Sequence, residues 1–276
     1  MSSFKDIVYG NNKIGRDWKN WIKTNYLRNC GITDILSILH SHGFSKFEID
    51  AAIRELWNES PMEGGYDINA AWFPNEPYSH DYEIVTLSKY PIIKIFKNIL
   101  TSEECEQLIA SGKNFKRART MGATENAVHD HRTNDLTVLD TSSSPLVAEL
   151  EDRIEEITGI PKENGETLQL LRYAKMQEYK PHQDFFSDTP NGNKSMELGG
   201  QRIATVITYL SDVESGGETI FPDITITVKP KAGDALYFEY CDRNGGITDH
   251  TRHGSKPVIS GTKYAVTKWL RHSTWK

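Results

Sequence analysis

The 276-residue sequence predicts a mainly β fold with flanking helices (α+β), of the sandwich or jelly-roll kind. From about residue 83, short runs rich in β-branched and aromatic residues alternate with clusters of Gly, Pro, Asn and Asp. Helical patterns are confined to the N-terminal region and to two segments before residue 160. We therefore expect a small helical region over 1–57, a linker or wrapping arm over 58–82, and a β-rich domain over 83–276.

The predicted helices carry start and stop signals. Three short apolar-periodic segments between residues 14 and 57 predict a small bundle. Thr101 and Glu104 belong to a capping signature that opens a helix through about Lys113. Pro145 and Gly159 bound another helix, because proline suits the first turn and glycine the residue after the last.

The predicted strands make up most of the remaining chain. After IVTL and PIIKIF, they cover TLQLLRY, RIATVITYL, ITITV, DALYFEY and KYAVTKWL. Turn-forming residues separate these runs, which is typical of antiparallel sheets.

Composition limits the classes of protein and partner. Charged residues make up 25% and hydrophobic residues 37%, as in an ordinary folded domain. A net charge of -6 argues against nucleic acid or an anionic membrane as the main partner. Cys30, Cys105 and Cys241 are scattered, which indicates reduced thiols. With no apolar run of signal-peptide or membrane-span length, we expect a soluble, intracellular, cytoplasmic protein; its oligomeric state is not readable.

The segment EYKPHQDFF holds the one His-x-Asp motif of the sequence. Residues i and i+2 of a strand share a face, so His182 and Asp184 would present an imidazole and a carboxylate together. His253 and His250 compete to supply a second imidazole. Two histidines and one carboxylate suit non-haem Fe(II) that binds a cosubstrate and O2. The histidine pair at 129–131 lies in a polar segment, which we interpret as a solvated loop.

A lysine follows the distal histidine candidates. Lys263 shares one face of a predicted strand with Ala265 and Thr267. A lysine on the inward face of a strand is unfavourable unless an anion accompanies it, and a dicarboxylate cosubstrate would supply that anion. The alternative is an edge-strand lysine that reaches out to solvent.

Several long stretches together resemble the catalytic domain of prolyl 4-hydroxylases, particularly the plant and algal type. They are RTNDLTVL, EDRIEEITGIPKENGETLQLLRY, QEYKPHQDFF, GGQRIATVITYLSDVESGGETIFP and HGSKPVISGTKYAVTKWL, in that order. The stretch PIIKIFKNILTSEECEQLIASG resembles the start of the same domain. The resemblance implies a double-stranded β-helix (jelly-roll) core.

The resemblance also implies roles for individual residues. His182, Asp184 and His253 match the iron ligands, which favours His253 over His250. Lys263 matches the residue that binds the distal carboxylate of 2-oxoglutarate. Further contacts to 2-oxoglutarate are implied for Tyr173 and Thr205, and contacts to the peptide substrate for Tyr179, Trp269, Arg271 and Arg132.

The implied reaction is hydroxylation of prolyl residues to 4-hydroxyproline in a peptide or protein, coupled to oxidative decarboxylation of 2-oxoglutarate to succinate and CO2. Fe(II), O2 and L-ascorbate are the implied cofactors, and a proline-containing peptide or protein is the implied partner. Two alternatives remain: a 2-oxoglutarate oxygenase with a non-prolyl target, and a non-catalytic jelly roll that binds peptides. For Tyr173, Tyr179 and Trp269, ordinary strand packing is the competing interpretation.

Four positions depart from the family pattern. Met176 stands where the family usually has glycine, Lys256 where many members have cysteine, and Tyr264 where tryptophan is common. Asn134 replaces a serine in the loop that carries Arg132. None of these changes removes an implied iron or cosubstrate ligand, but the loop changes bear on the choice of peptide.

Overall fold

The computed structural model describes most of the chain after residue 82 and parts of the N-terminal region. The described residues are 14–27, 32–42, 44, 48–49, 52–53, 56, 82–89, 91–118, 131–140, 144–187, 189–240 and 249–275. The predicted linker over 58–82 lies outside the described residues except for Tyr82.

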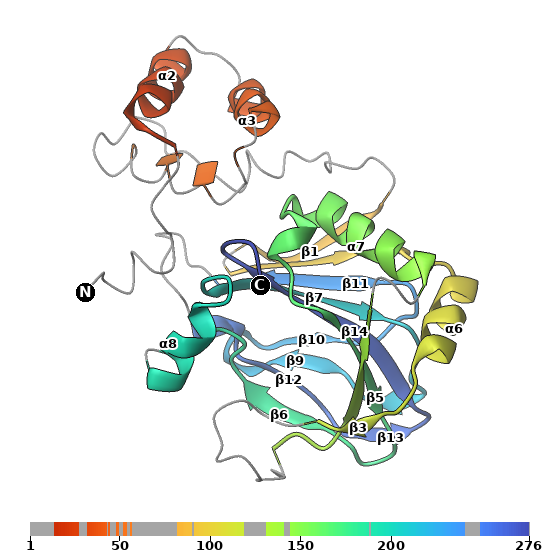
Figure 1. Ribbon diagram of the computed structural model, residues 1–276. Helices are drawn as coiled ribbons and strands as arrows, with labels where there is room; N and C mark the ends of the chain where they lie inside the picture. The colour runs from red at the N-terminus through yellow and green to blue at the C-terminus, as the bar shows by residue number, and fades with distance from the viewer. Residues whose placement is uncertain are drawn as a thin grey trace.

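Two antiparallel sheets form the core of the fold, as Figure 1 shows. The larger sheet has the order β1 (Ile84–Lys89), β2 (Ile92–Phe96), β11 (Ala235–Glu239), β7 (Arg202–Tyr209), β14 (Lys263–Arg271), β5 (Leu168–Tyr173), β4 (Asp135–Leu139) and β3 (Lys116–Arg117). The smaller sheet has the order β10 (Ile226–Val228), β9 (Thr219–Phe221), β12 (His253–Ser255) and β6 (Tyr179–His182). A two-stranded ladder joins β13 (Val258–Ser260) to β8 (Ser215–Gly216). The predicted mainly β, jelly-roll class is therefore confirmed.

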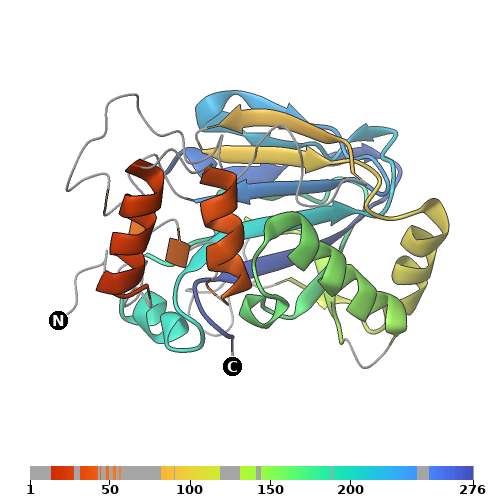
Figure 2. The same cartoon turned by 90° about the horizontal axis from the view of Figure 1, so that it is seen from above.

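Two helices pack on the outer face of the larger sheet, α6 (Ser102–Ser111) and α7 (Pro145–Thr158), as Figures 1 and 2 show. Thr101 and Glu104 form the predicted capping box at the start of α6. Gly159 ends α7 with φ 66°, the left-handed conformation that glycine adopts without strain. Both sets of predicted boundaries are therefore correct to within a few residues.

The central strands of the larger sheet are buried on both faces. On the outer face, Val206 and Val266 join the apolar cluster that includes Leu108 and Leu150 of the two helices. The alternate residues of the same strands, including Thr205, line a cavity between the two sheets. Because side chains alternate along a strand, every second residue of two adjacent strands, β7 and β14, faces one cavity.

The N-terminal region has an apolar cluster of its own. Helices α2 (Arg16–Leu27) and α3 (Ile32–Ser41) contribute to it together with the helical residues Ile49, Ala52, Ile53 and Leu56. Trp18 packs edge to face against Trp21 and Phe44 at its margin. No member of this cluster comes from the described residues after 56. The proposed division of the chain at residues 57 and 82 stays a prediction.

Other features agree with the sequence or refine it. Cys105 is free and buried, whereas Cys30 and Cys241 lie outside the described residues. None of the helices in the described parts of the chain has the length and apolarity of a membrane span. The strand predicted over 224–228 begins at Ile226, because a 3-10 turn occupies Pro222–Ile224. The short helix α8 (Pro190–Met196) precedes β7 and was not predicted.

The backbone conformation of Met176 explains why the family usually has glycine at this position. Met176 lies in the turn between β5 and β6 with φ 64°, and its side chain is 63% exposed. A side chain at positive φ crowds its own backbone, whereas glycine does not. Met176→Gly should therefore raise the free energy of unfolding by about 1 kcal/mol, as measured by urea denaturation.

The adjacent exposed residue gives the control. Lys175 does not have a positive φ, so glycine gains no conformational advantage there. Because glycine loses more conformational freedom on folding, Lys175→Gly should lower the free energy of unfolding by about 0.5–1 kcal/mol. A loss of stability in Met176→Gly comparable with that in Lys175→Gly would contradict this explanation.

Candidate active site

The predicted metal ligands meet where two strands of the smaller sheet pair. Strand β6 ends at His182, β12 begins at His253, and their antiparallel register sets the two histidines opposite each other. The expectation that Asp184 shares a strand with His182 is wrong, because Asp184 lies two residues beyond the end of β6. The three side chains still form one cluster, whose ligand atoms all lie within 4.8 Å of one another.

Backbone carbonyl groups orient both imidazoles. His182 Nδ1 lies 2.9 Å from the carbonyl oxygen of Lys180, and His253 Nδ1 lies 3.0 Å from that of Thr251. A carbonyl oxygen only accepts hydrogen bonds, so each Nδ1 carries the proton. Each Nε2 is then an unprotonated nitrogen near Asp184, at 3.4 Å for His182 and 3.5 Å for His253. This tautomer is the one that binds a metal through Nε2.

The electrostatics of the cluster favour a neutral His253 and an ionised Asp184. Burial disfavours the imidazolium form of His253 and lowers its pKa to about 4. Burial alone would raise the pKa of Asp184, but His253, His182 and Arg202 hold it well below its ordinary value. A neutral imidazole beside an ionised carboxylate is the combination that coordinates a divalent cation.

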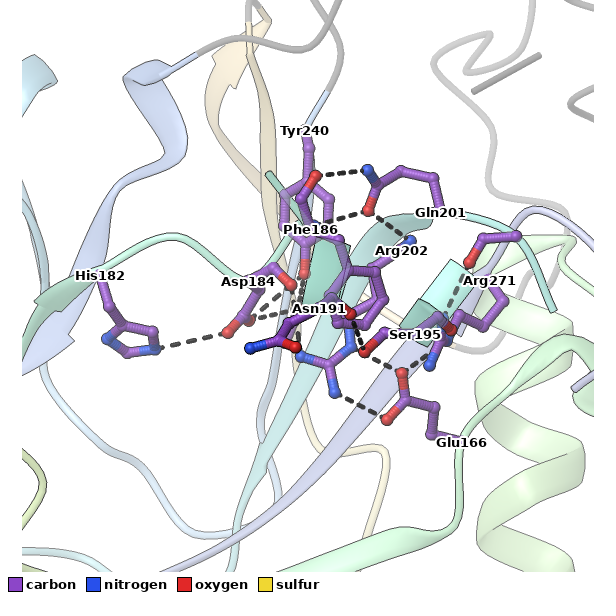
Figure 3. A network of polar contacts seen from close by, with 12 residues as sticks. Glu166, His182, Asp184, Phe186, Asn191, Ser195, Gln201, Arg202, Tyr240 and Arg271 are labelled. Atoms are coloured by element: carbon purple, nitrogen blue, oxygen red, sulfur yellow. Dashed lines mark hydrogen bonds and ion pairs between the residues drawn. The ribbon is translucent and has the colours of Figure 1, made fainter. Parts of the chain in front are cut away.

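Buried partners hold the Asp184 carboxylate in place. Thr205 on β7 donates from Oγ1 to Asp184 Oδ2 at 2.7 Å, and the hydroxyl of Tyr240 donates to the same oxygen at 3.3 Å. Arg202 Nη1 donates to the backbone carbonyl of Asp184 at 3.2 Å, and Arg202 Nε pairs with Glu166 at 2.6 Å. Figure 3 shows how this network surrounds the carboxylate. Such partners fix the direction in which a carboxylate presents its lone pairs.

Lys263 enters the same cavity from the first position of β14 and is 2% exposed. Its Nζ donates to the carbonyl oxygen of Gly217 at 2.9 Å and to Ser255 Oγ at 3.0 Å. The rings of Tyr173 and Tyr209 lie 5.2 Å and 5.5 Å from Nζ. These partners are neutral, and burial lowers the pKa of Lys263 to about 7. The ammonium is therefore placed to receive an anion.

Most of the remaining predicted residues line this cavity. They are Arg132, Tyr173, Tyr179, Thr205 and Trp269. The ring of Tyr179 stacks on that of His182 with 3.5 Å between centroids. Arg271 is not among the residues that line the cavity. Arg271 pairs with Glu166 at 2.6 Å and donates to the carbonyl oxygens of Ser195 and Gly200.

The competing histidines lie elsewhere on the chain. His250 is exposed on a 3-10 turn at Asp249–Thr251, outside the cluster. His131 is exposed, and His129 lies outside the described residues. Within the part of the chain that the structure describes, His182, Asp184 and His253 form the one group with metal-ligand geometry.

The residues fit the cofactors that such a site takes. Two Nε2 atoms and one carboxylate converge from one side and leave the remaining coordination positions open, the donor set of non-haem Fe(II) oxygenases. The buried ammonium of Lys263 suits the far carboxylate of 2-oxoglutarate in the same cavity. A jelly roll with this site defines an Fe(II)- and 2-oxoglutarate-dependent oxygenase, a class that also uses O2.

Comparison with known proteins agrees with this class and narrows it. The 2OG-Fe(II) oxygenase superfamily matches residues 168–271. The chain is 38% identical over 212 residues to probable prolyl 4-hydroxylase 8 of Arabidopsis thaliana, covering 69% of this chain and 72% of that protein. It is 35% identical to prolyl 4-hydroxylase 2 of the same plant, covering 68% and 70%. The chain belongs to the prolyl 4-hydroxylase family.

A solved structure supports the same fold. The viral collagen prolyl hydroxylase from Paramecium bursaria Chlorella virus-1, in complex with 2-oxoglutarate, is similar with a TM-score of 0.53 and 26% sequence identity. The similarity covers 68% of this chain and 98% of the viral one.

Sequence reasoning missed several residues that support the site. Tyr240, Arg202 and Glu166 carry no recognisable motif, because they come from three separated segments that only the folded sheets bring together. Ser255 was within reach of sequence reasoning, since it lies two residues after His253 and alternation in β12 points both to one face. The predicted contact of Thr205 with 2-oxoglutarate stays a prediction, and the hydroxyl of Thr205 already donates to Asp184.

Removing the hydroxyl of Thr205 should weaken metal binding. Thr205→Val keeps the side-chain shape but leaves Asp184 Oδ2 without its 2.7 Å hydrogen bond. We expect the affinity for Co(II), used as a spectroscopic substitute for Fe(II), to fall by about tenfold or more. Absorbance titration of the metal-free protein with Co(II) measures this change.

Thr208 on the same strand supplies a matched control. Its hydroxyl is buried and has no hydrogen-bond partner among the described residues, so Thr208→Val should leave Co(II) affinity unchanged. Equal affinities for Thr205→Val and the unmodified protein would show that the hydroxyl does not position the carboxylate.

The pKa of Lys263 makes binding of 2-oxoglutarate depend on pH. A bound carboxylate stabilises the ammonium and raises the pKa of Lys263 above its value of about 7 in the free protein. Below that value the lysine is already charged; above it, binding takes up a proton and affinity falls by at most about tenfold per pH unit. Calorimetry of the Co(II)-loaded protein, in buffers of different ionisation enthalpy, measures this proton uptake.

Lys263→Arg tests the origin of the effect, because arginine stays charged across this range. The variant should bind 2-oxoglutarate with little pH dependence, whatever its absolute affinity. Proton uptake that persists in Lys263→Arg would assign the effect to another group.

Proposed function

We propose that the protein hydroxylates prolyl residues in a peptide or protein, coupled to decarboxylation of 2-oxoglutarate. One oxygen atom of O2 enters the prolyl C4–H bond as a hydroxyl, and the other enters succinate, with release of CO2. The proposal rests on one observation: His182, Asp184, His253 and Lys263 all line the same cavity. Similarity to prolyl 4-hydroxylases over more than two thirds of the chain supports the prolyl target.

Different residues of the chain would bind the iron and the 2-oxoglutarate. His182, Asp184 and His253 would hold iron, and Lys263 with Tyr173 would hold the distal carboxylate of 2-oxoglutarate. The bound iron, with its cosubstrates, supplies the oxidative chemistry. The apolar walls of the cavity exclude water from the reacting centre.

The aromatic residues near the metal cluster support a peptide contact. Trp269 lines the cavity, and its buried indole N–H has no acceptor among the described residues. The guanidinium of Arg202 lies 3.9 Å from the Trp269 ring centroid and fixes the ring in place. A buried donor without an acceptor is unfavourable, and a peptide carbonyl of the substrate would accept a hydrogen bond from this N–H. For Arg271, by contrast, a substrate contact requires that the pair with Glu166 be shared or broken.

Mass spectrometry of treated peptides tests the function. The protein, with Fe(II), 2-oxoglutarate and ascorbate, should add the mass of one oxygen atom to proline in proline-rich or collagen-like peptides. His182→Ala should abolish the gain because the metal loses a ligand, whereas His250→Ala should retain it because His250 lies outside the cluster.

The outcomes separate the alternatives. Turnover of 2-oxoglutarate without a gain on any prolyl peptide would favour an oxygenase with a different target. Unchanged peptide binding and no turnover in either the unmodified protein or His182→Ala would favour a non-catalytic binding protein.

A further inference from the structure

Three buried cations outside the cavity, Lys268, Arg202 and Arg271, have carboxylate partners. Lys268 Nζ, on the helix side of β14, pairs with Glu151 of α7, and both residues are buried. Arg202 and Arg271 share Glu166, each at 2.6 Å. This is the usual arrangement, because an unpaired buried charge is strongly destabilising.

Two buried cations that line the cavity lack such a partner. Lys263 is 2% exposed and Arg132 is 5% exposed. Among the described residues, neither forms an ion pair with Asp or Glu, although both face the same enclosed space. Within the part of the chain that the structure describes, these two positive charges are therefore left to be neutralised by what enters the cavity.

When the family's cofactors bind, they neutralise one of these two positive charges. Asp184 is the one carboxylate among the described residues that line the cavity, against the two cations. Fe(II) adds two positive charges and 2-oxoglutarate adds two negative ones, so their binding leaves the imbalance of one positive charge. Lys263 would receive the distal carboxylate of 2-oxoglutarate. The charge that remains belongs to Arg132.

Neutral groups fix the position of the Arg132 side chain without neutralising its positive charge. Its Nε donates to Asn134 Oδ1 at 3.0 Å, and its Cζ lies 4.7 Å from the centroid of the Tyr179 ring. Asn134 is fully buried and anchored in turn by a hydrogen bond from Nδ2 to the backbone carbonyl of Asp135. With Nε occupied by Asn134, the two NH2 groups of Arg132 form the pair of parallel donors that suits a carboxylate.

The residue that holds Arg132 departs from the family pattern that the sequence resemblance implies. Asn134 stands where the family usually has serine, and the amide oxygen of asparagine extends further from the backbone than a serine hydroxyl. Tyr179, which contacts Arg132, also stacks on His182, so the guanidinium lies close to the metal cluster. A group bound to Arg132 would therefore lie near the target proline.

We propose that Arg132, restrained by Asn134, recognises a carboxylate carried by the peptide substrate close to the hydroxylated proline. The carboxylate is either an Asp or Glu side chain or the C-terminal carboxylate of the peptide. This proposal rests on the proposed prolyl hydroxylation and deepens it, because it names acidic prolyl peptides as the preferred substrates.

Matched peptides test the proposal with the complete protein, Fe(II) and 2-oxoglutarate. One series carries Asp or Glu at each position within three residues of a single proline, and its partners carry Asn or Gln instead. A second series compares free with amidated C-termini, which separates the two sources of the carboxylate. We expect at least one acidic peptide to exceed its neutral isostere by about tenfold or more in kcat/KM, mainly through KM.

Variants assign that preference to Arg132. In Arg132→Gln the acidic and neutral peptides should react at similar kcat/KM, and Arg132→Lys should retain part of the preference because the charge remains. Asn134→Ser should weaken the preference by releasing Nε of Arg132. Arg172→Gln, which removes an arginine paired with Asp135 and outside the cavity lining, should leave the preference intact.

The outcomes distinguish failure of the inference from failure of the function. Hydroxylation of neutral and acidic isosteres at equal rates would overturn the inference, leave the prolyl function standing, and indicate that Arg132 binds peptide carbonyls. A preference that survives in Arg132→Gln would overturn it as well. Absence of hydroxylation in every peptide would instead refute the proposed function on which the inference rests. Because loss of Arg132 can impair folding, the circular dichroism spectrum of each variant is compared with that of the unmodified protein.

Discussion

The antiparallel pairing of β6 with β12 is the constraint on which the site depends. It places His253 opposite His182 and, through the segment that follows β6, brings Asp184 against both. Side chains alternate along a strand, so a shift of one residue in this register would turn an imidazole away from the cavity. Strand β9 supports the register from the other side of β12, where Gly254 pairs with Ile220. A Cβ on Gly254 would lie 2.7 Å from the carbonyl oxygen of Tyr179, so the pairing requires glycine there.

The larger sheet adds the second half of the site by the same alternation. Thr205 on β7 and Lys263 on β14 point into the cavity, while Val206 and Val266, on the opposite face of the same strands, pack with the helices. The sequence alone predicted the strands, the His-x-Asp motif and the inward lysine, because each is visible in local spacing. The choice of His253 over His250 required the family resemblance, since only the folded sheets separate two histidines three residues apart.

Sequence reasoning was least complete where function depends on long-range contacts. Tyr240 and Arg202 hold Asp184, yet nothing in DALYFEY or RIATVITYL distinguishes them from ordinary strand residues. The position of Asp184 beyond β6 was also missed, because a two-residue spacing does not reveal where a strand ends. Met176 shows the opposite case: its departure from the family glycine was visible in the sequence, but its meaning appeared only with the positive φ of the turn.

The two cations that we propose bind ligands, Lys263 and Arg132, have aromatic rings beside them where other buried cations have carboxylates. Tyr173 and Tyr209 lie near the ammonium of Lys263, and Tyr179 lies against the guanidinium of Arg132. A ring face stabilises a desolvated cation by about 2 kcal/mol, less than a carboxylate does, and leaves its hydrogen-bond donors available. Lys268, which lies outside the cavity, pairs with the carboxylate of Glu151 instead. Arg202 has both kinds of neighbour, the ring of Trp269 and the carboxylate of Glu166. The lack of a carboxylate partner among the described residues, and not the presence of a ring, therefore sets Lys263 and Arg132 apart from Arg202, Arg271 and Lys268.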